Sequence, residues 1–147
     1  MVRTAPAGGV FSEDTVAAVA GTLAAHGEVV CAYVFGSVLH SPAVARDLDI
    51  GVYIDLTMTG GDILPSAVRI YDSLKRALGR TDIDVSPLND SSHALRHEVI
   101  AKGACVYSRC ESERVDFETM SELAYYDFLP MQRMFDESTW RHIREYY

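Results

Sequence analysis

The sequence predicts an α/β (α+β) fold in which helices flank a small mixed β-sheet, with a helical segment at the C-terminus. Three observations lead to this prediction. Short apolar runs and strict apolar–polar alternation, both typical of strands, recur along the chain. Apolar residues at three- and four-residue spacing, typical of helices, occur between them. At 147 residues the chain has room for a single core, so residues 1–147 are expected to form one domain.

The N-terminal part is expected to contain a loose tail, a helix and a strand. Residues 1–10 form the tail. Ser12 can cap a helix that runs from Glu13 to His26 and is ended by Gly27. The apolar, β-branched and aromatic run over 29–35 then predicts a buried strand.

The turn Gly36-Ser37 ends this strand. Glycine allows a tight turn and a close approach by a ligand, and Ser37 is suited to capping a short helix that follows. Free N–H groups at the start of a helix attract anions, so the turn is a candidate for holding the phosphates of a nucleotide. Arg46, which precedes the next strand, is a further candidate for phosphate contact, although a salt bridge is the simpler explanation for it.

The next strand carries a pair of carboxylates. Over residues 47–54, apolar residues alternate with Asp47, Asp49, Gly51 and Tyr53, which predicts a strand with one buried face. Asp47 and Asp49 then point the same way. Two residues along a strand advance roughly 6.6 Å, so the two side chains can share a pair of divalent ions roughly 3.5–4 Å apart.

A third carboxylate is expected on a neighbouring strand. Residues 81–86 alternate in the same way and contain two rival ligands, Asp82 and Asp84. Asp84 is preferred because both of its neighbours are apolar. Carboxylates gathered without a cation raise one another's pKa and cost stability. The pattern therefore predicts a metal site with Asp47, Asp49 and Asp84 as ligands.

The other elements of the sheet region are bounded by glycines, a proline and polar capping residues. A loop is expected over 57–62 and a helix over 63–78, which Gly79 ends. The Asp84 strand ends at Pro87. A second helix, capped within Asn89-Asp90-Ser91, runs to Lys102 and is ended by Gly103, and a short strand follows over 104–107. His93 and His97 are spaced to hold zinc, but the Glu that a metalloprotease needs is missing, so a solvated helix face is preferred.

The segment 111–147 predicts a helix that Pro130 should bend or divide. An apolar stripe runs along it, formed by Phe117, Met120, Ala124, Phe128, Met131 and Phe135. Two interpretations remain open. Either the stripe simply packs on the sheet, or part of it, with nearby tyrosines and Trp140, is a partner surface, where aromatic and Met side chains are favoured.

The order of these motifs resembles the polymerase β-like nucleotidyltransferase superfamily. Phe35-Gly36-Ser37, Asp47-Leu48-Asp49-Ile50 and Ile83-Asp84-Val85 match its pattern in order. Among its members the chain is most similar to the minimal nucleotidyltransferases (MNT), the antitoxins of prokaryotic HEPN–MNT toxin–antitoxin modules, and the similarity covers essentially the whole chain. The chain differs from these antitoxins in the segment between the Gly36-Ser37 turn and Asp47, which here has nine residues and ends in Arg46.

The resemblance implies transfer of AMP from ATP to a tyrosine hydroxyl of a cognate HEPN RNase toxin, which silences the toxin. It implies two Mg²⁺ ions held by Asp47 and Asp49, with Asp84 on the catalytic ion, and terminal phosphates held by Gly36 and Ser37. Two alternatives stay open. One is a non-catalytic antitoxin that occludes its partner; the other is a small-molecule nucleotidyltransferase of the aminoglycoside type, for which 147 residues leave little room.

Composition narrows the partners and the location. The chain has 21 acidic and 13 basic residues and a formal net charge of −8, which argues against a nucleic-acid surface and suits a basic partner. No apolar run approaches the roughly 18 residues of a membrane span, and no export signal is expected. Three cysteines without a Cys-x-x-Cys pair fit reduced thiols in a prokaryotic cytoplasm.

Overall fold

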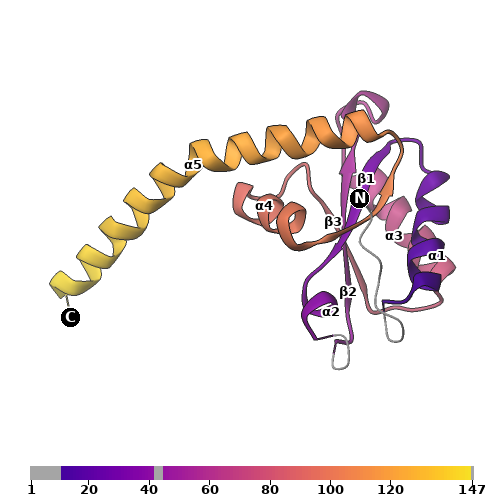
Figure 1. Cartoon of the computed structure of the whole chain (residues 1–147), viewed down its shortest axis with the longest axis horizontal. Coiled ribbons are helices and arrows are strands. Elements are labelled where there is room, and N and C mark those ends of the chain that lie inside the picture. Colours follow the sequence, from indigo (N-terminus) through magenta and orange to yellow (C-terminus); the bar gives the residue numbers. More distant parts are fainter. Residues whose placement is uncertain (1–10, 42–44, 147) are drawn as a thin grey trace.

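The structure is a computed structural model that describes residues 11–41 and 45–146. The tail predicted over 1–10 therefore lies outside the described residues. Figure 1 shows the elements, which in chain order are α1 (Glu13–Ala24), β1 (Val29–Phe35), α2 (Ser37–His40), β2 (Leu48–Ile54), the 3₁₀ helix η1 (Leu56–Met58), α3 (Leu64–Leu78), β3 (Ile83–Pro87), α4 (His93–Lys102), β4 (Ala104–Ser108) and α5 (Glu111–Tyr146).

The four strands form one sheet in the order β3-β2-β1-β4. β1 pairs antiparallel with both β2 and β4, whereas β2 and β3 are parallel. The predicted mixed sheet is therefore confirmed. Because parallel strands run in one direction, the acidic start of β2 lies beside the start of β3.

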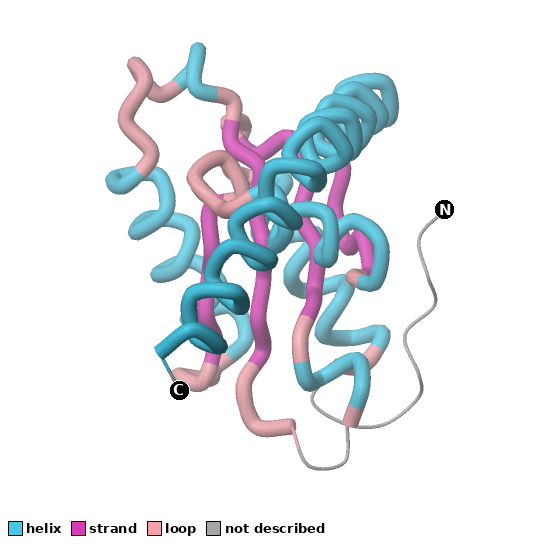
Figure 2. Tube along the Cα trace, turned by 90° about the vertical axis from the view of Figure 1, so that its left-hand side faces the viewer, coloured by secondary structure: helices cyan, strands magenta, loops and turns pink. Residues whose placement is uncertain are grey.

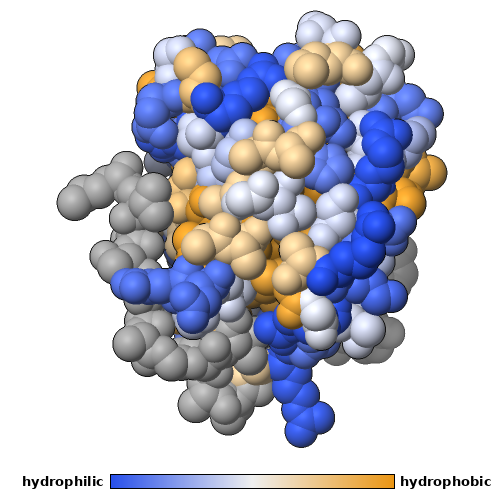
Figure 3. All heavy atoms as spheres, turned by 90° about the vertical axis from the view of Figure 1, so that its right-hand side faces the viewer, coloured by the Kyte–Doolittle hydropathy of each residue, from blue (hydrophilic) through white to orange (hydrophobic). Residues whose placement is uncertain are grey.

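Helices lie on both sides of the sheet (Figure 1), and α5 is nearest the viewer in Figure 2. The α1 and α3 side holds the larger core, in which the predicted apolar face of β2 is buried together with α1 and α3 residues: Leu48, Ile50, Val52, Ile54, Val19, Leu23, Ile70 and Leu74. A smaller cluster on the other side includes Tyr33, Leu88, Val99 and Phe117. From the α1 side, the surface shows small apolar patches among polar side chains (Figure 3).

The caps of the first helices are partly as predicted. Ser12 caps α1, and its hydroxyl accepts a hydrogen bond from the Thr15 backbone N–H at 3.2 Å. The helix ends at Ala24, however, so Gly27 does not end it as predicted. At α2 the N-cap is Gly36, and Ser37 is the first helical residue rather than the cap.

The N-cap of α4 is Ser92, one residue beyond the predicted group. Its hydroxyl accepts from the Leu95 backbone N–H at 3.1 Å. The earlier residues are engaged elsewhere, because the Asn89 side chain hydrogen-bonds both the N–H and the carbonyl of Ile54. Asn89 thus joins the end of β2 to the loop before α4. The end of α3 is as predicted, with Gly79 in the left-handed region at φ 62°.

Helix α5 is continuous over 36 residues although Pro130 lies inside it. Figure 1 shows its axis changing direction part-way along, so the helix is bent and not divided. A bend is expected at Pro130, because proline lacks an N–H and its ring clashes with the preceding turn of the helix. Only its first half packs on the sheet: Phe117 is buried and stacks on Tyr53 with 4.1 Å between ring centroids. Met131 and Phe135 are 51% and 64% exposed. The interpretation that the whole apolar stripe packs on the sheet is therefore wrong.

No helix within the described residues has the length and apolarity needed to cross a bilayer.

Gly103, at the end of α4, provides a test of this packing. A Cβ at Gly103 would collide with the carbonyl oxygen of Val99 and lie 3.2 Å from that of Val34. Gly103→Ala is therefore expected to lower the free energy of unfolding by about 1–3 kcal/mol. The control is Gly21→Ala, which has nothing within 4 Å of the added Cβ and should stabilise α1 by about 0.5–1 kcal/mol. Urea denaturation measures both, and equal midpoints for the two variants would contradict the prediction.

Candidate active site

The turn after β1 is built around a close contact that only glycine permits. Gly36 has φ 84° and ψ −154°, a conformation unfavourable for residues with a Cβ. A Cβ at Gly36 would overlap the Oδ2 atom of Asp49. The two are brought together by the sheet, because Phe35 at the end of β1 pairs with Asp49 near the start of β2. The carboxylate therefore lies directly against the turn.

The carboxylates predicted to act together come from two neighbouring strands. Asp49 and Asp84 are register partners in the parallel pair of β2 and β3, and such strands are about 4.8 Å apart. Asp47 precedes β2 and is exposed, Asp84 is also exposed, and Asp49 is partly buried. The structure thus places the three predicted residues at one end of the sheet.

The surroundings of Asp49 oppose ionisation of its carboxyl group. Burial raises the pKa of Asp49, and the charges of Asp84 and then Asp47 raise it further. Each effect disfavours the ionised carboxylate. A cation at this position would offset the repulsion, so the pKa shift of Asp49 is in the direction expected of a cation site.

These residues suit Mg²⁺ by their chemistry, since hard divalent cations bind carboxylate oxygens. Within residues 11–41 and 45–146, however, no three His, Cys, Asp or Glu side chains are gathered closely enough to hold a metal ion. The sheet brings the backbones of Asp49 and Asp84 together, while repulsion opposes convergence of their carboxylates. A metal held by Asp47, Asp49 and Asp84 therefore stays a prediction, and binding it would require their carboxylate oxygens to move closer together.

Asp82, the rival third ligand, has a different partner. The Arg80 guanidinium donates to both Asp82 carboxylate oxygens, at 2.6 and 2.7 Å, and to the Arg46 carbonyl at 2.7 Å. Hydrogen bonding from Arg80 lowers the pKa of Asp82. This pairing favours Asp84 over Asp82 as the third ligand. Sequence reasoning missed Arg80, whose spacing from Asp82 on a short loop was the available signal.

The remaining predicted contacts lie at the rim of this region. Ser37 is exposed at the start of α2, next to Gly36. Arg46 is exposed immediately before Asp47, and its carbonyl is held by Arg80. Arg80 therefore fixes the backbone that leads into the acidic strand. Phosphate contacts by Ser37 and Arg46 stay predictions.

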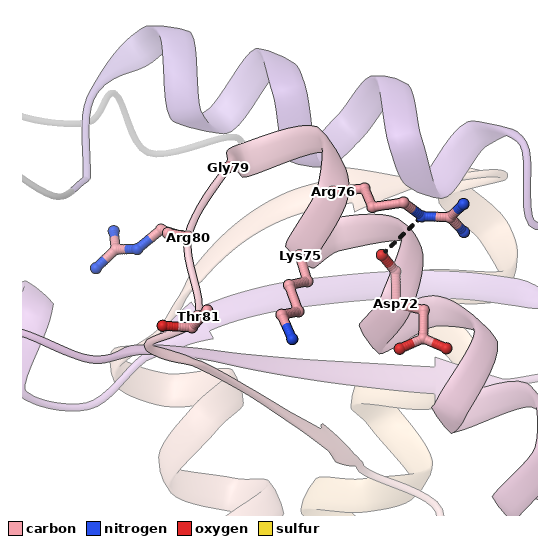
Figure 4. A pocket seen from close by; sticks show the side chains of 6 residues that line it. All are labelled: Asp72, Lys75, Arg76, Gly79, Arg80 and Thr81. Carbon is pink, nitrogen blue, oxygen red and sulfur yellow. Dashed lines mark hydrogen bonds between the residues drawn. The ribbon is translucent and has the colours of Figure 1, made fainter.

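A hollow of about 540 Å³ at the C-terminal end of α3 carries several cations but does not form an anion site. Figure 4 shows the side chains of Lys75, Arg76 and Arg80 pointing in different directions. The Arg76 Nε donates to the Asp72 carbonyl, and Arg80 is engaged by Asp82. Basic residues in a last turn are favoured by the helix dipole, which explains Lys75 and Arg76 without a ligand.

Of the two histidines of α4, His93 is exposed, as a solvated helix face predicts, whereas His97 is partly buried against α5. The His97 ring stacks on Tyr125 at 3.9 Å, and its Nδ1 lies 2.9 Å from both carboxylate oxygens of Glu122. The His93 ring lies 5.4 Å from that of Phe128. These contacts attach α4 to the first half of α5.

Comparison with known proteins supports the fold. A rebuilt and re-refined structure of tri-AMPylated Shewanella oneidensis HEPN toxin in complex with MNT antitoxin contains a chain with a TM-score of 0.62 and 18% identity, with 86% of this chain and 98% of that chain covered. A toxin–antitoxin complex with AMP-PNP gives 0.63 and 19%, with 84% and 98% covered. An MntA–HepT toxin–antitoxin complex gives 0.62 and 17%, with 87% and 99% covered.

At these identities the structural likeness shows the fold alone. No curated protein matches the chain. Residues 18–112 match the sequence profile described as "Polymerase beta, Nucleotidyltransferase", and this range is more than half of the 147 residues. It contains the Gly36 turn and all three carboxylates of the candidate site. The chain therefore belongs to the polymerase beta nucleotidyltransferase family.

Proposed function

We propose that this protein is an antitoxin that transfers AMP from ATP to a tyrosine hydroxyl of a cognate HEPN RNase toxin, and so neutralises it. The proposal rests chiefly on the contact between the Gly36 turn and the Asp49 carboxylate, beside Asp84. It is supported by the fold shared with chains of toxin–antitoxin complexes, one described as containing a tri-AMPylated HEPN toxin and one as containing AMP-PNP.

Each residue of the site has a defined role in this proposal. Gly36 leaves room for the Asp49 carboxylate to lie against the turn, and the Ser37 hydroxyl and nearby backbone N–H groups hold the terminal phosphates. Arg46, exposed at the mouth of the site, contributes a positive charge to the triphosphate. Asp84 faces the acceptor and takes the proton from its hydroxyl.

The transfer is a single displacement at the α-phosphorus of ATP. The tyrosine Oη forms a new bond to this phosphorus, and the bond from the phosphorus to the α,β-bridging oxygen breaks. Pyrophosphate leaves with that electron pair, and the phenolic proton passes to the Asp84 carboxylate. The chain contributes by positioning the two reactants, which is the main contribution of proteins to phosphoryl-type transfer.

Asp47 and Asp49 would hold two Mg²⁺ ions, with Asp84 as a further ligand of one. When bound, the ions supply neutralisation of the triphosphate and a lower pKa for the attacking hydroxyl. The proposed place of action is the prokaryotic cytoplasm, where protein thiols stay reduced; Cys31, Cys105 and Cys110 are all free cysteines.

The alternative is an antitoxin that occludes its toxin without chemistry. The two can be separated by whether neutralisation needs nucleotide. The RNase activity of the HEPN partner is measured after incubation with the chain, with and without ATP and Mg²⁺, followed by separation of the two proteins. Loss of RNase activity that persists after separation, and only when ATP was present, is the expected result. Inhibition that needs no ATP and ends on separation would contradict the proposal.

The second half of α5 is proposed as the toxin-binding surface. Its exposed apolar side chains are Met131, Met134, Phe135, Trp140 and Ile143, which are 42–70% exposed and which we call the distal α5 surface. Figure 1 shows this half extending away from the sheet. Exposed aromatic and Met residues are favoured anchors at interfaces, and the net charge of −8 suits a basic partner.

The double substitution Phe135→Ser, Trp140→Ser is expected to weaken toxin binding about a hundredfold, because buried aromatic anchors dominate interface energies. Affinity is measured by calorimetry with the intact HEPN partner. Val115→Ser, an exposed apolar residue in the first turns of the same helix, is the control and should bind normally. Unchanged affinity in the double variant would exclude the distal α5 surface from the interface.

A further inference from the structure

The outer edge of β3 is open next to the candidate third carboxylate. β3 is an edge strand of the sheet. On its inner side the Leu48 N–H donates to the Asp82 carbonyl and the Leu88 N–H donates to the Val52 carbonyl. In a parallel ladder the inward-facing groups alternate, so Asp84 also bonds inward, and the N–H and carbonyl of Val85 point outward. Among the described residues, none hydrogen-bonds to Val85 from outside the sheet.

An apolar hollow lies along this edge. It has a volume of about 330 Å³ and is lined on one side by α3 and on the other by β3. Leu64 and Val68 of α3 are 70% and 50% exposed there, and Tyr71 lies deeper. From β3 it is lined by Asp84 and Val85. A strand placed along β3 would therefore have this hollow on one of its faces.

The two faces of such a strand would meet different surroundings. Side chains alternate between the faces of a sheet. Val85 packs on the side of the α1 and α3 core, and Asp84, one residue away, points to the other side with Asp49. A residue whose side chain lay beside Asp84 would thus have neighbours, one position before and after, directed toward Leu64 and Val68.

Charge indicates what kind of segment would fit. Two acidic residues, Asp84 and Asp90, contribute to the lining of the hollow, although the Asp84 side chain points to the other face of the sheet, and no basic residue contributes to it. An acidic rim beside an apolar hollow selects a segment that has both an apolar and a basic side chain.

Building on the proposed function, we propose that the acceptor enters as an extended segment that pairs with the outer edge of β3. Its tyrosine hydroxyl lies at Asp84, a neighbouring apolar side chain fills the hollow between α3 and β3, and a basic side chain nearby faces Asp90. Strand addition of this kind gives affinity through main-chain hydrogen bonds and specificity through alternate side chains. The hollow thus selects which hydroxyl is modified.

The first test changes the wall of the hollow. Leu64→Ser, Val68→Ser should raise the KM for the HEPN acceptor about tenfold and leave the KM for ATP unchanged, because the proposal places both exposed residues against the acceptor and not against the nucleotide. Val115→Ser is the surface control and should behave as the wild type. A raised KM for ATP instead would assign the hollow to the nucleotide base and overturn the proposal.

The second test changes the edge itself. Proline is tolerated at edge positions whose N–H points outward, so Val85→Pro removes one outward donor, and Val85→Ala loses the same side chain but keeps the donor. The kcat/KM for the acceptor should be about tenfold lower in Val85→Pro than in Val85→Ala, with equal AMP-PNP affinity. Equal kcat/KM in an active background would overturn edge pairing while the proposed function stands. A wild-type protein that transfers no AMP would overturn both.

Discussion

Gly36→Ala is expected to reduce AMP transfer by about a hundredfold or more, since displacing a reacting group by about 1 Å costs on this order. The added methyl group would occupy the space of the Asp49 carboxylate oxygen. Asp49 would then have to turn away from the turn that receives the phosphates. The rate of AMP incorporation into the HEPN partner, at saturating ATP, measures the effect.

A matched control separates this collision from backbone strain. Gly61 has φ 88°, nearly the same as the 84° of Gly36, but nothing lies within 4 Å of a Cβ there. Gly61→Ala should therefore also strain the backbone at positive φ, by about 1–2 kcal/mol, and keep wild-type transfer. Equal activity loss in both variants would mean that strain, and not the contact with Asp49, accounts for the effect of Gly36→Ala.

Asp49→Asn is expected to reduce the rate of AMP transfer roughly a thousandfold. At the same time it is expected to raise the melting temperature by about 2 °C at neutral pH. The first effect follows from loss of a carboxylate at the centre of the site. The second follows because burial, Asp84 and Asp47 raise the pKa of Asp49, so its ionised form opposes folding. A neutral amide removes that cost.

The sign of the pH dependence follows from the same shift. The pKa of Asp49 is higher in the folded than in the unfolded state, so between these two values the folded state binds more protons. Wild-type stability should therefore fall as pH rises from the unfolded pKa through the folded pKa of Asp49. This decrease should be smaller in Asp49→Asn. Melting curves across the acidic range measure both.

Asp82→Asn provides the opposite case. Arg80 lowers the pKa of Asp82, so the ionised carboxylate favours folding and its loss should lower the melting temperature. Mg²⁺ gives an independent readout, because a ligand bound only by the folded state stabilises it. Mg²⁺ should raise the melting temperature of the wild type and of Asp82→Asn, but not of Asp49→Asn. A destabilised Asp49→Asn would refute the account of its electrostatics.

The elements of the sheet could be predicted because each has its own periodic signal. Alternation in 47–54 predicted the buried face of β2, and the apolar run in 29–35 predicted β1. The pairing of Asp49 with Asp84 depended on the parallel register of β2 and β3, which local sequence does not specify. Alternation over 81–86 predicted that Asp84 lies on a strand, and a shared metal site required that strand to be a neighbour of β2.

Other features depend on tertiary contacts and were missed. The role of Arg80 arises because it reaches the Arg46 carbonyl across the fold. The partial burial of His97 arises because α5 passes over α4 and places Glu122 and Tyr125 against it. The extent of the exposed part of α5 depends on where the sheet ends, which the apolar stripe alone cannot indicate.

The most direct test of the proposed transfer is the intact mass of the cognate HEPN protein after incubation with this chain, ATP and Mg²⁺. The wild type should add one or more AMP units, and fragmentation should place them on a tyrosine. The double variant Asp47→Asn, Asp49→Asn should add none. An unmodified partner that is nevertheless inhibited equally by the wild type and the double variant would contradict the transferase account and leave a purely binding antitoxin.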